Sequence, residues 1–525
     1  METIVNPSPQ QWKALCTRAV ADDAVIEGRV RAILERVRTG GDAALVEITR
    51  EVEGRDVSGP SAYIGGQVCE SEHQSKSLAS RSKACPECAD VAGVQRADNQ
   101  QDVNNHPSQK DRGDIQDFAD IQEDTLQNIN PFIVSREQIA AAAGEVSEDV
   151  KAAIAQAAKN ICAFHAAQKP RPVEVETMPG VRCLRRSLPI ERVGLYIPGG
   201  SAPLFSKLLM LAIPAKIAGC REVVLCTPAG IDGRIAPAVL YAASVCGVDT
   251  IYSLGGAQAI AAMAFGTETI APVSKIFGPG NRYVTKAKQM VASTGVAIDM
   301  PAGPSEVMVM ADDTADARFV ASDLLSQAEH GPDSQAILVC KSEQFAAAVA
   351  REVERQLALL PRRDIATKAL ENSRIVVFTE EPEASGEKVS EGEHQHKLKS
   401  EPERSFLAAA EGVIAFANAY APEHLIISMR DPWAIAEQIT AAGSVFIGNY
   451  SPESAGDYAS GTNHTLPTTG LARAWSGIGL DSFMHSITYQ ELTREGLQSL
   501  GKTIITMAEA EGLDAHAAAV KTRLE

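Results

Sequence analysis

The chain has 525 residues, of which 45% are hydrophobic and 22% charged, and its formal net charge is -18. This length and composition are ordinary for a globular protein of roughly two to four domains with a large core. The acidic balance excludes non-specific binding to nucleic acid or to an anionic membrane, because both require a positively charged face.

The sequence also argues against export and membrane insertion. No stretch approaches the ~20 consecutive apolar residues of a membrane-spanning helix, and the N-terminus METIVNPSPQQWKAL lacks the basic and apolar regions of a secretory signal. We therefore expect a cytoplasmic protein. The ten cysteines are scattered, and Cys226 and Cys340 lie in strand-like apolar runs. We interpret the cysteines as reduced core residues, not as a disulfide framework.

The first part of the chain divides into a helical segment and a polar one. Residues 1–54 are predicted to form a helical N-terminal segment, and residues 55–127 form a polar insertion. A second polar insertion covers residues 380–405. Their composition cannot bury enough apolar surface to offset the entropy of ordering, which predicts disorder.

Two metal-like patterns fall inside these insertions. Cys85 and Cys88 form a CxxC pattern, and His394 and His396 form an HxH pattern. Neither has a second matched pair, so we favour an accidental or structural origin over metal binding.

From about residue 191 the pattern becomes regular. Short apolar runs rich in Val and Ile alternate with helical patterns, which is typical of parallel strands covered by helices on both faces. The strands are expected at residues 192–198, 222–228, 250–254, 275–278, 306–312, 336–340, 374–378, 424–429 and 444–448. The sequence therefore predicts an α/β protein with two Rossmann-like, doubly wound parallel-sheet domains and smaller helical N- and C-terminal pieces.

The domain boundaries follow from this alternation. Residues 128–195 and 307–478 are predicted to form the first Rossmann-like domain. Residues 196–306 form the second, and residues 479–525 form a helical C-terminal segment.

Three polar residues lie at the strand ends of the second domain. Gly278-Pro279-Gly280-Asn281 follows a strand and opens a helix, where backbone N–H groups and the helix dipole favour a phosphate. The same four residues are equally compatible with a simple tight turn. Tyr196 and Gln258 occupy equivalent strand ends, so with Asn281 they outline a nucleotide crevice at the carboxyl edge of the sheet.

A second group of polar residues follows the strands of the first domain. Gln327 and His330 are three residues apart at a helix end and therefore share a face. Asp457 and His464 lie in a loop rich in Gly and Ser that contributes little to a core. Each residue alone is compatible with core packing or solvent exposure, but several polar motifs at the ends of one strand series favour a site.

The adjacent Glu423 and His424 are the candidate acid–base pair. They lie in YAPEHLI, at the mouth of a predicted strand. A carboxylate and an imidazole in different surroundings supply a base and an acid of different strength.

Seven segments, taken together and in order, closely resemble the histidinol dehydrogenase family. The resemblance covers residues 192–379 and 406–525 almost throughout, and residues 1–51 and 133–168 fit the helical N-terminal part of the family. The two polar insertions have no counterpart there. The segments are RVGLYIPGG, PAKIAGC, GPGNRYVTKAK, DMPAGPSE, DLLSQAEHGPDSQ, YAPEHLI and SPESAGDYASGTNHTLPT.

This resemblance implies roles for individual residues. Glu423 and His424 would be the acid–base pair. The remaining roles are one Zn²⁺ per subunit held by Gln327, His330, Asp457 and His516; NAD contacts from Tyr196, Gln258 and Asn281; and substrate contacts from Ser305, Gln327, His330, His424, Asp457, His464, Glu511 and His516.

The resemblance also implies an activity and an assembly. L-Histidinol would be oxidised through L-histidinal to L-histidine, the last steps of histidine biosynthesis, with reduction of two NAD. The first domain would carry the zinc and acid–base residues and the second would bind NAD. The C-terminal segment would complete the active site of the partner in a homodimer.

Alternatives remain within and outside the family. One is a paralogue that acts on another small amino or sulfonate alcohol; Glu511, suited to a cationic amine, argues for histidinol. The others are a zinc hydrolase without NAD, against which the nucleotide crevice argues, and a silent binding protein. One departure from the family pattern is Lys207, where a small hydroxyl residue is usual, and it bears on fine specificity.

Overall fold

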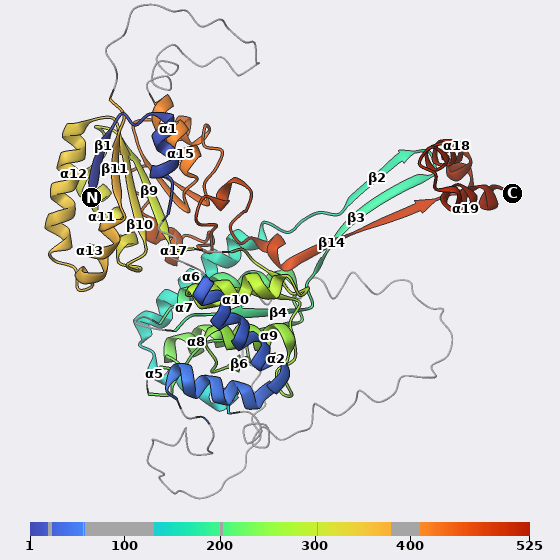
Figure 1. Cartoon of the computed structure of the whole chain (residues 1–525), viewed down its shortest axis with the longest axis horizontal. Coiled ribbons are helices and arrows are strands. Elements are labelled where there is room, and N and C mark those ends of the chain that lie inside the picture. The colour runs from blue at the N-terminus through green and yellow to red at the C-terminus, as the bar shows by residue number, and fades with distance from the viewer. Residues whose placement is uncertain are drawn as a thin grey trace, which may run out of the picture.

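The protein consists of two α/β units and a long arm that carries the C-terminus (Figure 1). The computed structural model describes residues 1–18, 24–55, 57, 131–199, 203–230, 232–301, 303–379 and 410–525. Within this part of the chain, no helix is both long and apolar enough to cross a membrane.

The first unit is built on a six-stranded parallel sheet. From edge to edge, its strands are β1 (Glu2–Val5), β11 (Arg374–Val377), β10 (Gln335–Cys340), β9 (Glu306–Ala311), β12 (His424–Ser428) and β13 (Ser444–Ile447). The register pairs Glu306 with Gln335 and His424 with Val307. The first residues of these central strands are therefore neighbours at one end of the sheet.

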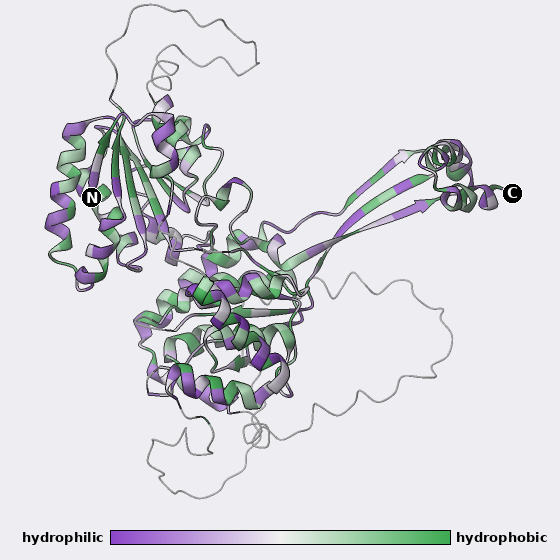
Figure 2. Ribbon diagram, in the orientation of Figure 1, coloured by the Kyte–Doolittle hydropathy of each residue, from purple (hydrophilic) through white to green (hydrophobic). Residues whose placement is uncertain are grey.

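Helices cover both faces of this sheet. Along β9, Val307 and Val309 pack in one core cluster, while Met308 and Met310 pack in another, as the alternation of strand side chains requires. Figure 2 shows the apolar strands running through the interior of the unit. The helices are α1 (Pro9–Leu15), α11 (Ala317–Ala328), α12 (Glu343–Leu357), α13 (Arg363–Glu371), α15 (Glu411–Tyr420), α16 (Pro432–Ala436) and α17 (Glu453–Tyr458).

The second unit is a five-stranded parallel sheet. Its order is β6 (Thr250–Tyr252), β5 (Glu222–Cys226), β4 (Arg192–Tyr196), β7 (Lys275–Phe277) and β8 (Ala297–Ile298). One face packs against α5 (Arg136–Glu145), α6 (Glu148–Ala166), α7 (Phe205–Ala218) and α8 (Pro237–Val245). The other packs against α2 (Ala24–Glu53), α9 (Gly256–Phe265) and α10 (Arg282–Ala292). The two sheets and their helices confirm the predicted α/β fold class.

The arm is an antiparallel ribbon that ends in two helices. Its strands lie in the order β14 (Met484–Leu492), β3 (Val181–Pro189) and β2 (Val173–Met178). Helices α18 (Arg494–Ala510) and α19 (Asp514–Leu524) pack on each other at the tip, away from both units (Figure 1). Two 3₁₀ turns, η2 (Leu471–Arg473) and η3 (Leu480–Phe483), precede β14.

The elements are distributed differently from the predicted domain boundaries. Residues 1–54 are not purely helical, because β1 pairs with β11. In residues 128–195, α5 and α6 pack on the five-stranded sheet and β4 is its central strand, so this segment does not belong with residues 307–478. The terminal segment 479–525 contains β14 as well as helices. The ribbon strands were missed because none has a continuous apolar run; β2 and β14 are mostly exposed, and β3 is interrupted by arginines.

Several predictions concern cysteines and insertions. Cys226 and Cys340 are free and fully buried in the core, as the strand pattern predicts. The insertions 55–127 and 380–405 lie outside the described residues, apart from Arg55 and Val57, and so do the CxxC and HxH patterns.

A buried histidine makes the stability of the fold depend on pH. His165 in α6 is 0% exposed, and its Nδ1 lies 2.9 Å from the Ile161 carbonyl oxygen. Burial lowers the pKa of His165 below its ordinary value near 6.5. Below that pH the unfolded chain binds a proton more readily than the folded one, so stability is lost as the pH falls.

We therefore expect His165→Leu to become relatively more stable than the wild type as the pH falls from about 7.5 to about 5.5. The difference in unfolding free energy should change by at most about 1.4 kcal/mol per pH unit. Urea denaturation across this range measures it. Ile154→Val, at a buried apolar position of the same helix, removes no titratable group and is the control. Its difference in unfolding free energy from the wild type should not change with pH, and an equally flat difference for His165→Leu would contradict the prediction.

Candidate active site

The candidate acid–base pair lies at the amino ends of the strands in the six-stranded sheet. Glu423 immediately precedes β12, and His424 is its first residue. Both side chains are buried, with exposed fractions of 7% and 5%. Oε2 of Glu423 accepts from the Glu306 N–H at 2.8 Å, and Nδ1 of His424 lies 3.1 Å from the Glu306 carbonyl oxygen. Because a carbonyl only accepts, Nδ1 carries the proton of this bond.

Three ligand-type side chains converge beside this pair. His330, Glu453 and Asp457 each offer one ligand atom, and these atoms lie within 4.8 Å of one another. Nε2 of His330 is 3.7 Å from Oδ2 of Asp457, and Nε2 of His424 is 3.6 Å from Oδ1. Gln327 is 0% exposed on the same helix end as His330, and neither side-chain amide atom has a hydrogen-bond partner among the described residues. Buried polar atoms without partners are costly unless a ligand satisfies them.

Glu453 is a site residue that the sequence analysis missed. It opens α17, one turn before Asp457, and its side chain is 1% exposed. Oε1 lies 3.8 Å from Nδ1 of His424, and both carboxylate oxygens are without a hydrogen-bond partner within the described chain. The spacing of four residues between two acidic groups on one helix was the available signal.

Burial dominates the acidity of the two glutamates. Removal from water raises the pKa of Glu423 to about 7, with smaller contributions from Glu306 and Asp457. Burial likewise raises the pKa of Glu453 to about 8, assisted by the charges of Asp457 and Glu423. Carboxyl groups whose pKa lies close to physiological pH can both take up and release a proton there.

The pKa values of His424 and Asp457 shift in the directions that favour the charged form of each side chain. Burial alone would lower the pKa of His424, but the carboxylates of Glu453, Glu423 and Asp457 outweigh it and raise the pKa to about 10. Burial alone would raise the pKa of Asp457, but His424, with further help from His464 and His330, lowers it to about 2. The imidazole and this carboxylate therefore stabilise each other's charge.

His464 and Lys207 also belong to this region. Nδ1 of His464 is 2.7 Å from the Asp457 carbonyl oxygen, and Nε2 is buried without a hydrogen-bond partner in the described part of the chain. Burial and the Lys207 ammonium lower the pKa of His464 to about 4, so this imidazole is neutral. Burial lowers the pKa of Lys207, while Asp457 and Glu423 oppose the shift. The unusual lysine therefore lies within electrostatic reach of the candidate ligands.

The site lies where the two units meet. Nδ2 of Asn463 donates to the Met210 carbonyl of α7 at 2.5 Å, and Nδ2 of Asn160 in α6 donates to the Ala459 carbonyl at 2.8 Å. The α7 helix begins after the carboxyl end of β4, and Lys207 in its first turn lies within electrostatic reach of Asp457 and Glu423. The amino ends of one sheet thus face the carboxyl ends of the other.

The predicted nucleotide residues gather at those carboxyl ends. The Tyr196 hydroxyl accepts from the Gly256 N–H at 3.1 Å, and the side chain of Asn281 caps α10. Gln258 is 1% exposed; its Nε2 donates to Glu53 at 3.2 Å, whereas its Oε1 has no hydrogen-bond partner among the described residues. Gly278 has φ +114°, and a Cβ added there would lie 2.0 Å from the Tyr196 carbonyl oxygen.

Not all predicted residues meet within one chain. Ser305 directly precedes β9 and its carbonyl accepts from the Gln335 N–H at 3.2 Å, so it lies beside the pair. Glu511 is the capping residue directly after α18 and His516 lies in α19, at the tip of the arm and away from both units (Figure 1).

Comparison with known proteins identifies the family. A family model described as histidinol dehydrogenase matches residues 114–391 and 387–524. Histidinol dehydrogenase from Bacteroides fragilis is 54% identical over 397 residues, covering 76% of this chain and 86% of the relative. The Vibrio cholerae protein of the same name is 53% identical, covering 75% and 84%. The chain belongs to the histidinol dehydrogenase family.

Structural comparison agrees with this assignment. The crystal structure of histidinol dehydrogenase from Elizabethkingia anophelis superposes with a TM-score of 0.78 at 42% identity, covering 100% of this chain and 98% of the other. The protein is therefore an oxidoreductase of a histidine-biosynthesis family, as the seven motifs predicted.

The close approach of Gly278 to the main chain of Tyr196 generates a prediction for the loop that the sequence analysis expects to bind a nucleotide. Gly278→Ala should weaken NADH binding and lower stability by more than the about 1–3 kcal/mol of backbone strain, because the new methyl group meets a main-chain oxygen. Gly295→Ala is the matched control: its φ is +103°, and nothing lies within 4 Å of an added Cβ. Urea denaturation and fluorescence titration with NADH measure both effects, and equal losses in the two variants would refute the close approach.

Proposed function

We propose that this protein oxidises L-histidinol through L-histidinal to L-histidine, with one Zn²⁺ per subunit and reduction of two NAD. The observation that carries the proposal is the convergence of His330, Asp457 and Glu453 beside the buried pair Glu423–His424. Groups of this kind could hold a metal ion, and the neighbouring acid–base pair could exchange protons with an alcohol substrate bound to that ion. The net change consumes one water and transfers two hydrides.

The donor set is compatible with zinc. Imidazole and carboxylate are common zinc ligands, and the unpartnered amide of Gln327 adds a neutral oxygen. Within one chain, Gln327, His330 and Asp457 would hold the metal, with His516 from a partner. Bound zinc would supply a fixed positive charge that orients the substrate, since zinc has no redox chemistry of its own.

His424 is suited to accept the proton of the alcohol. Its Nδ1–H is held by the Glu306 carbonyl, so Nε2 is the nitrogen available to the substrate. The surrounding carboxylates favour the protonated imidazole. A cation near Asp457 would offset their charge and shift His424 toward its basic form.

Glu423 is suited to activate water for the second oxidation. Its raised pKa makes the carboxylate a stronger base than an ordinary glutamate, and the Glu306 N–H fixes one of its oxygens. Addition of water to the aldehyde gives a hydrate, from which the second hydride leaves. His424 would again take the proton.

Tyr196, Gln258 and Asn281 are the proposed NAD contacts. They lie at the carboxyl ends of the five-stranded sheet, where nucleotides bind in open α/β folds. The N-termini of α9 and α10 add positive potential for a pyrophosphate.

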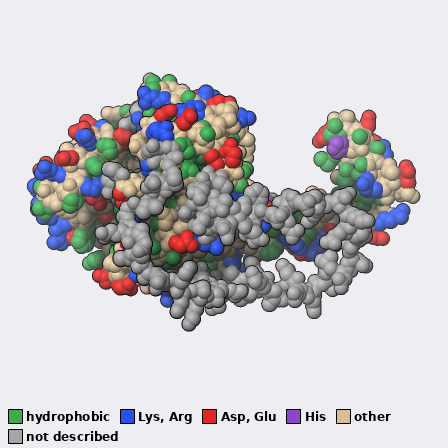
Figure 3. Space-filling view, turned by 90° about the horizontal axis from the view of Figure 1, so that it is seen from below, with side chains coloured by type: hydrophobic (Ala, Val, Ile, Leu, Met, Phe, Trp, Pro, Cys, Tyr) green, Lys and Arg blue, Asp and Glu red, His purple; other side chains and the backbone are tan. Residues whose placement is uncertain are grey.

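We also propose a cytoplasmic homodimer with shared sites. The arm carries Glu511 and His516 away from the rest of its own site, which supports their use by a partner (Figure 1). Apolar side chains are exposed on the arm: Val173 and Val175 on β2, and Met507 and Leu513 at the tip, are 44–60% exposed. Figure 3 shows such hydrophobic side chains among charged ones at the arm's end.

The activity is tested with zinc-loaded protein, NAD and L-histidinol. We expect two NADH per histidinol consumed, followed by NADH absorbance. Removal of metal with a chelator should abolish turnover, and zinc should restore it. Full activity after complete removal of metal would refute the zinc assignment, and turnover only with another small amino or sulfonate alcohol would favour a paralogue.

Glu423→Gln should separate the two oxidations. The amide cannot activate water, so oxidation of histidinal should fall on the order of 10²–10⁴-fold while oxidation of histidinol falls less. His424→Ala, the comparison variant, should depress both, because each oxidation releases a proton. Assays started from either substrate measure the ratio, and equal losses for Glu423→Gln would remove the basis for this division.

Mixing two inactive variants tests the shared site. His424→Ala and His516→Ala are unfolded together and refolded in equal amounts. If the tail serves the partner, one site of each mixed dimer carries both lesions and the other carries none. Half of the dimers are mixed, so activity should return to roughly a quarter of wild type. No recovery despite proven mixed dimers would show that the tail serves its own chain.

A further inference from the structure

The main chain of Glu306 contacts both members of the candidate acid–base pair. Its N–H donates to Glu423, and its carbonyl oxygen accepts from His424. Glu306 is the first residue of β9, at the centre of the six-stranded sheet. A shift of this single residue would therefore displace both groups at once.

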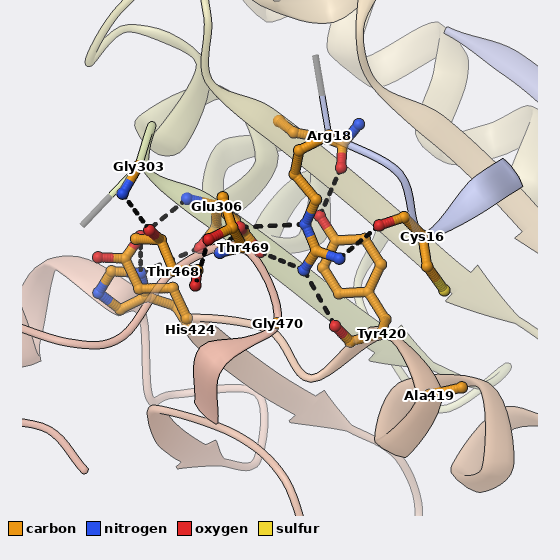
Figure 4. Close-up of polar contacts among 12 residues, drawn as sticks. Cys16, Arg18, Gly303, Glu306, Ala419, Tyr420, His424, Thr468, Thr469 and Gly470 are labelled. Carbon is orange, nitrogen blue, oxygen red and sulfur yellow. Dashed lines mark hydrogen bonds and ion pairs between the residues drawn. The ribbon is translucent and has the colours of Figure 1, made fainter. Parts of the chain in front are cut away.

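An arginine from near the N-terminus holds the side chain of Glu306. Nε of Arg18 donates to Oε1 at 3.1 Å and Nη2 donates to Oε2 at 2.6 Å, a two-pronged pair between residues 288 positions apart. The side chains are only 9% and 1% exposed. The Thr469 N–H also donates to Oε1. Figure 4 shows Arg18, Glu306 and His424 connected through this network.

Arg18 is held by several contacts besides its ion pair with Glu306. Its guanidinium lies 3.6 Å from the centre of the Tyr420 ring and donates to the carbonyl oxygens of Cys16 at 2.6 Å and Tyr420 at 3.0 Å. The Tyr420 hydroxyl donates to Oε1 of Gln335 at 2.6 Å. Only a planar group with several N–H donors satisfies this geometry, so lysine is not an equivalent.

We propose that Arg18 and Glu306 are positioning residues for the reaction, because their ion pair fixes the start of β9 and thereby holds Glu423 and His424 in place for proton transfer. The inference rests on the proposed function for its substrate. Neither residue is among those assigned to zinc, NAD or histidinol. A displacement of about 1 Å in a catalytic group can cost on the order of 100-fold in rate.

Steady-state kinetics of zinc-loaded variants test this role. Arg18→Met should lower kcat on the order of 10- to 100-fold with little change in KM, because substrate binding is retained while the alignment for proton transfer is lost. Arg18→Lys keeps the charge but not the fork, and should be intermediate. The control is Arg234→Met, which removes an exposed pair with Glu145 and should behave as wild type.

A double-mutant cycle separates positioning from loss of the arginine alone. Glu306→Gln removes the charge that Arg18→Met leaves unpaired while keeping the main chain of β9. The double variant should therefore recover part of the lost kcat, so that the two effects are not additive. Strictly multiplicative losses would contradict a shared role.

A readout without turnover keeps the inference separate from the proposed function. Nuclear magnetic resonance of labelled histidine rings, with His424 assigned from the spectrum of His424→Gln, reports the surroundings of the imidazole. The His424 signals should move in Arg18→Met and stay in Arg234→Met, whether or not the wild type oxidises histidinol. Unchanged signals together with an unchanged kcat overturn the inference. If Arg18→Met does not fold, the same two measurements on Arg18→Lys decide.

Discussion

The burial of several carboxylates at the amino ends of one sheet is the constraint on which the site depends. Glu423, Glu453 and Asp457 have side chains that are 7%, 1% and 13% exposed. Taking such groups from water costs free energy unless cations or hydrogen bonds compensate. His424 and Lys207 provide part of that compensation, and two of the acids shift toward neutrality. A bound divalent cation would provide more, so the same arrangement favours metal binding.

The two sheets face each other end to end, so the proposed acid–base residues and the proposed NAD contacts come from different sheets. The proposed acid–base pair extends from amino ends of the six-stranded sheet, whereas the proposed NAD residues extend from carboxyl ends of the five-stranded sheet. Contacts such as Asn463 to Met210 tie the two ends together. In the proposed reaction, the proton acceptor would belong to one unit and the bound hydride acceptor to the other, so that each would be oriented by its own sheet.

Strands and site motifs that show as a pattern in contiguous sequence could be predicted, whereas contacts between residues far apart in the chain could not. The apolar runs predicted the parallel strands, and the loop motifs predicted Gln327, His330, Asp457 and the pair Glu423–His424 as neighbours. Glu453 carried a helical spacing that was overlooked. The contact between Arg18 and Glu306 joins residues 288 positions apart, and no pattern near either residue indicates the other. In the arm, β2 (VEVETM) alternates as a strand does, but it buries no face within its chain, and no nearby pattern indicates its pairing partner β3.

The arm is difficult to explain as part of an isolated chain. A narrow antiparallel ribbon exposed on both faces is weakly stabilised by its own contacts, and its edge strands β2 and β14 present unpaired backbone groups. It nevertheless carries Glu511 and His516 at its tip, away from the buried site of their own chain (Figure 1). In the proposed symmetric dimer, burial of the arm on a partner would both stabilise the ribbon and deliver these two residues. Assembly would then be part of the active site, since each site would draw its ligands from two chains.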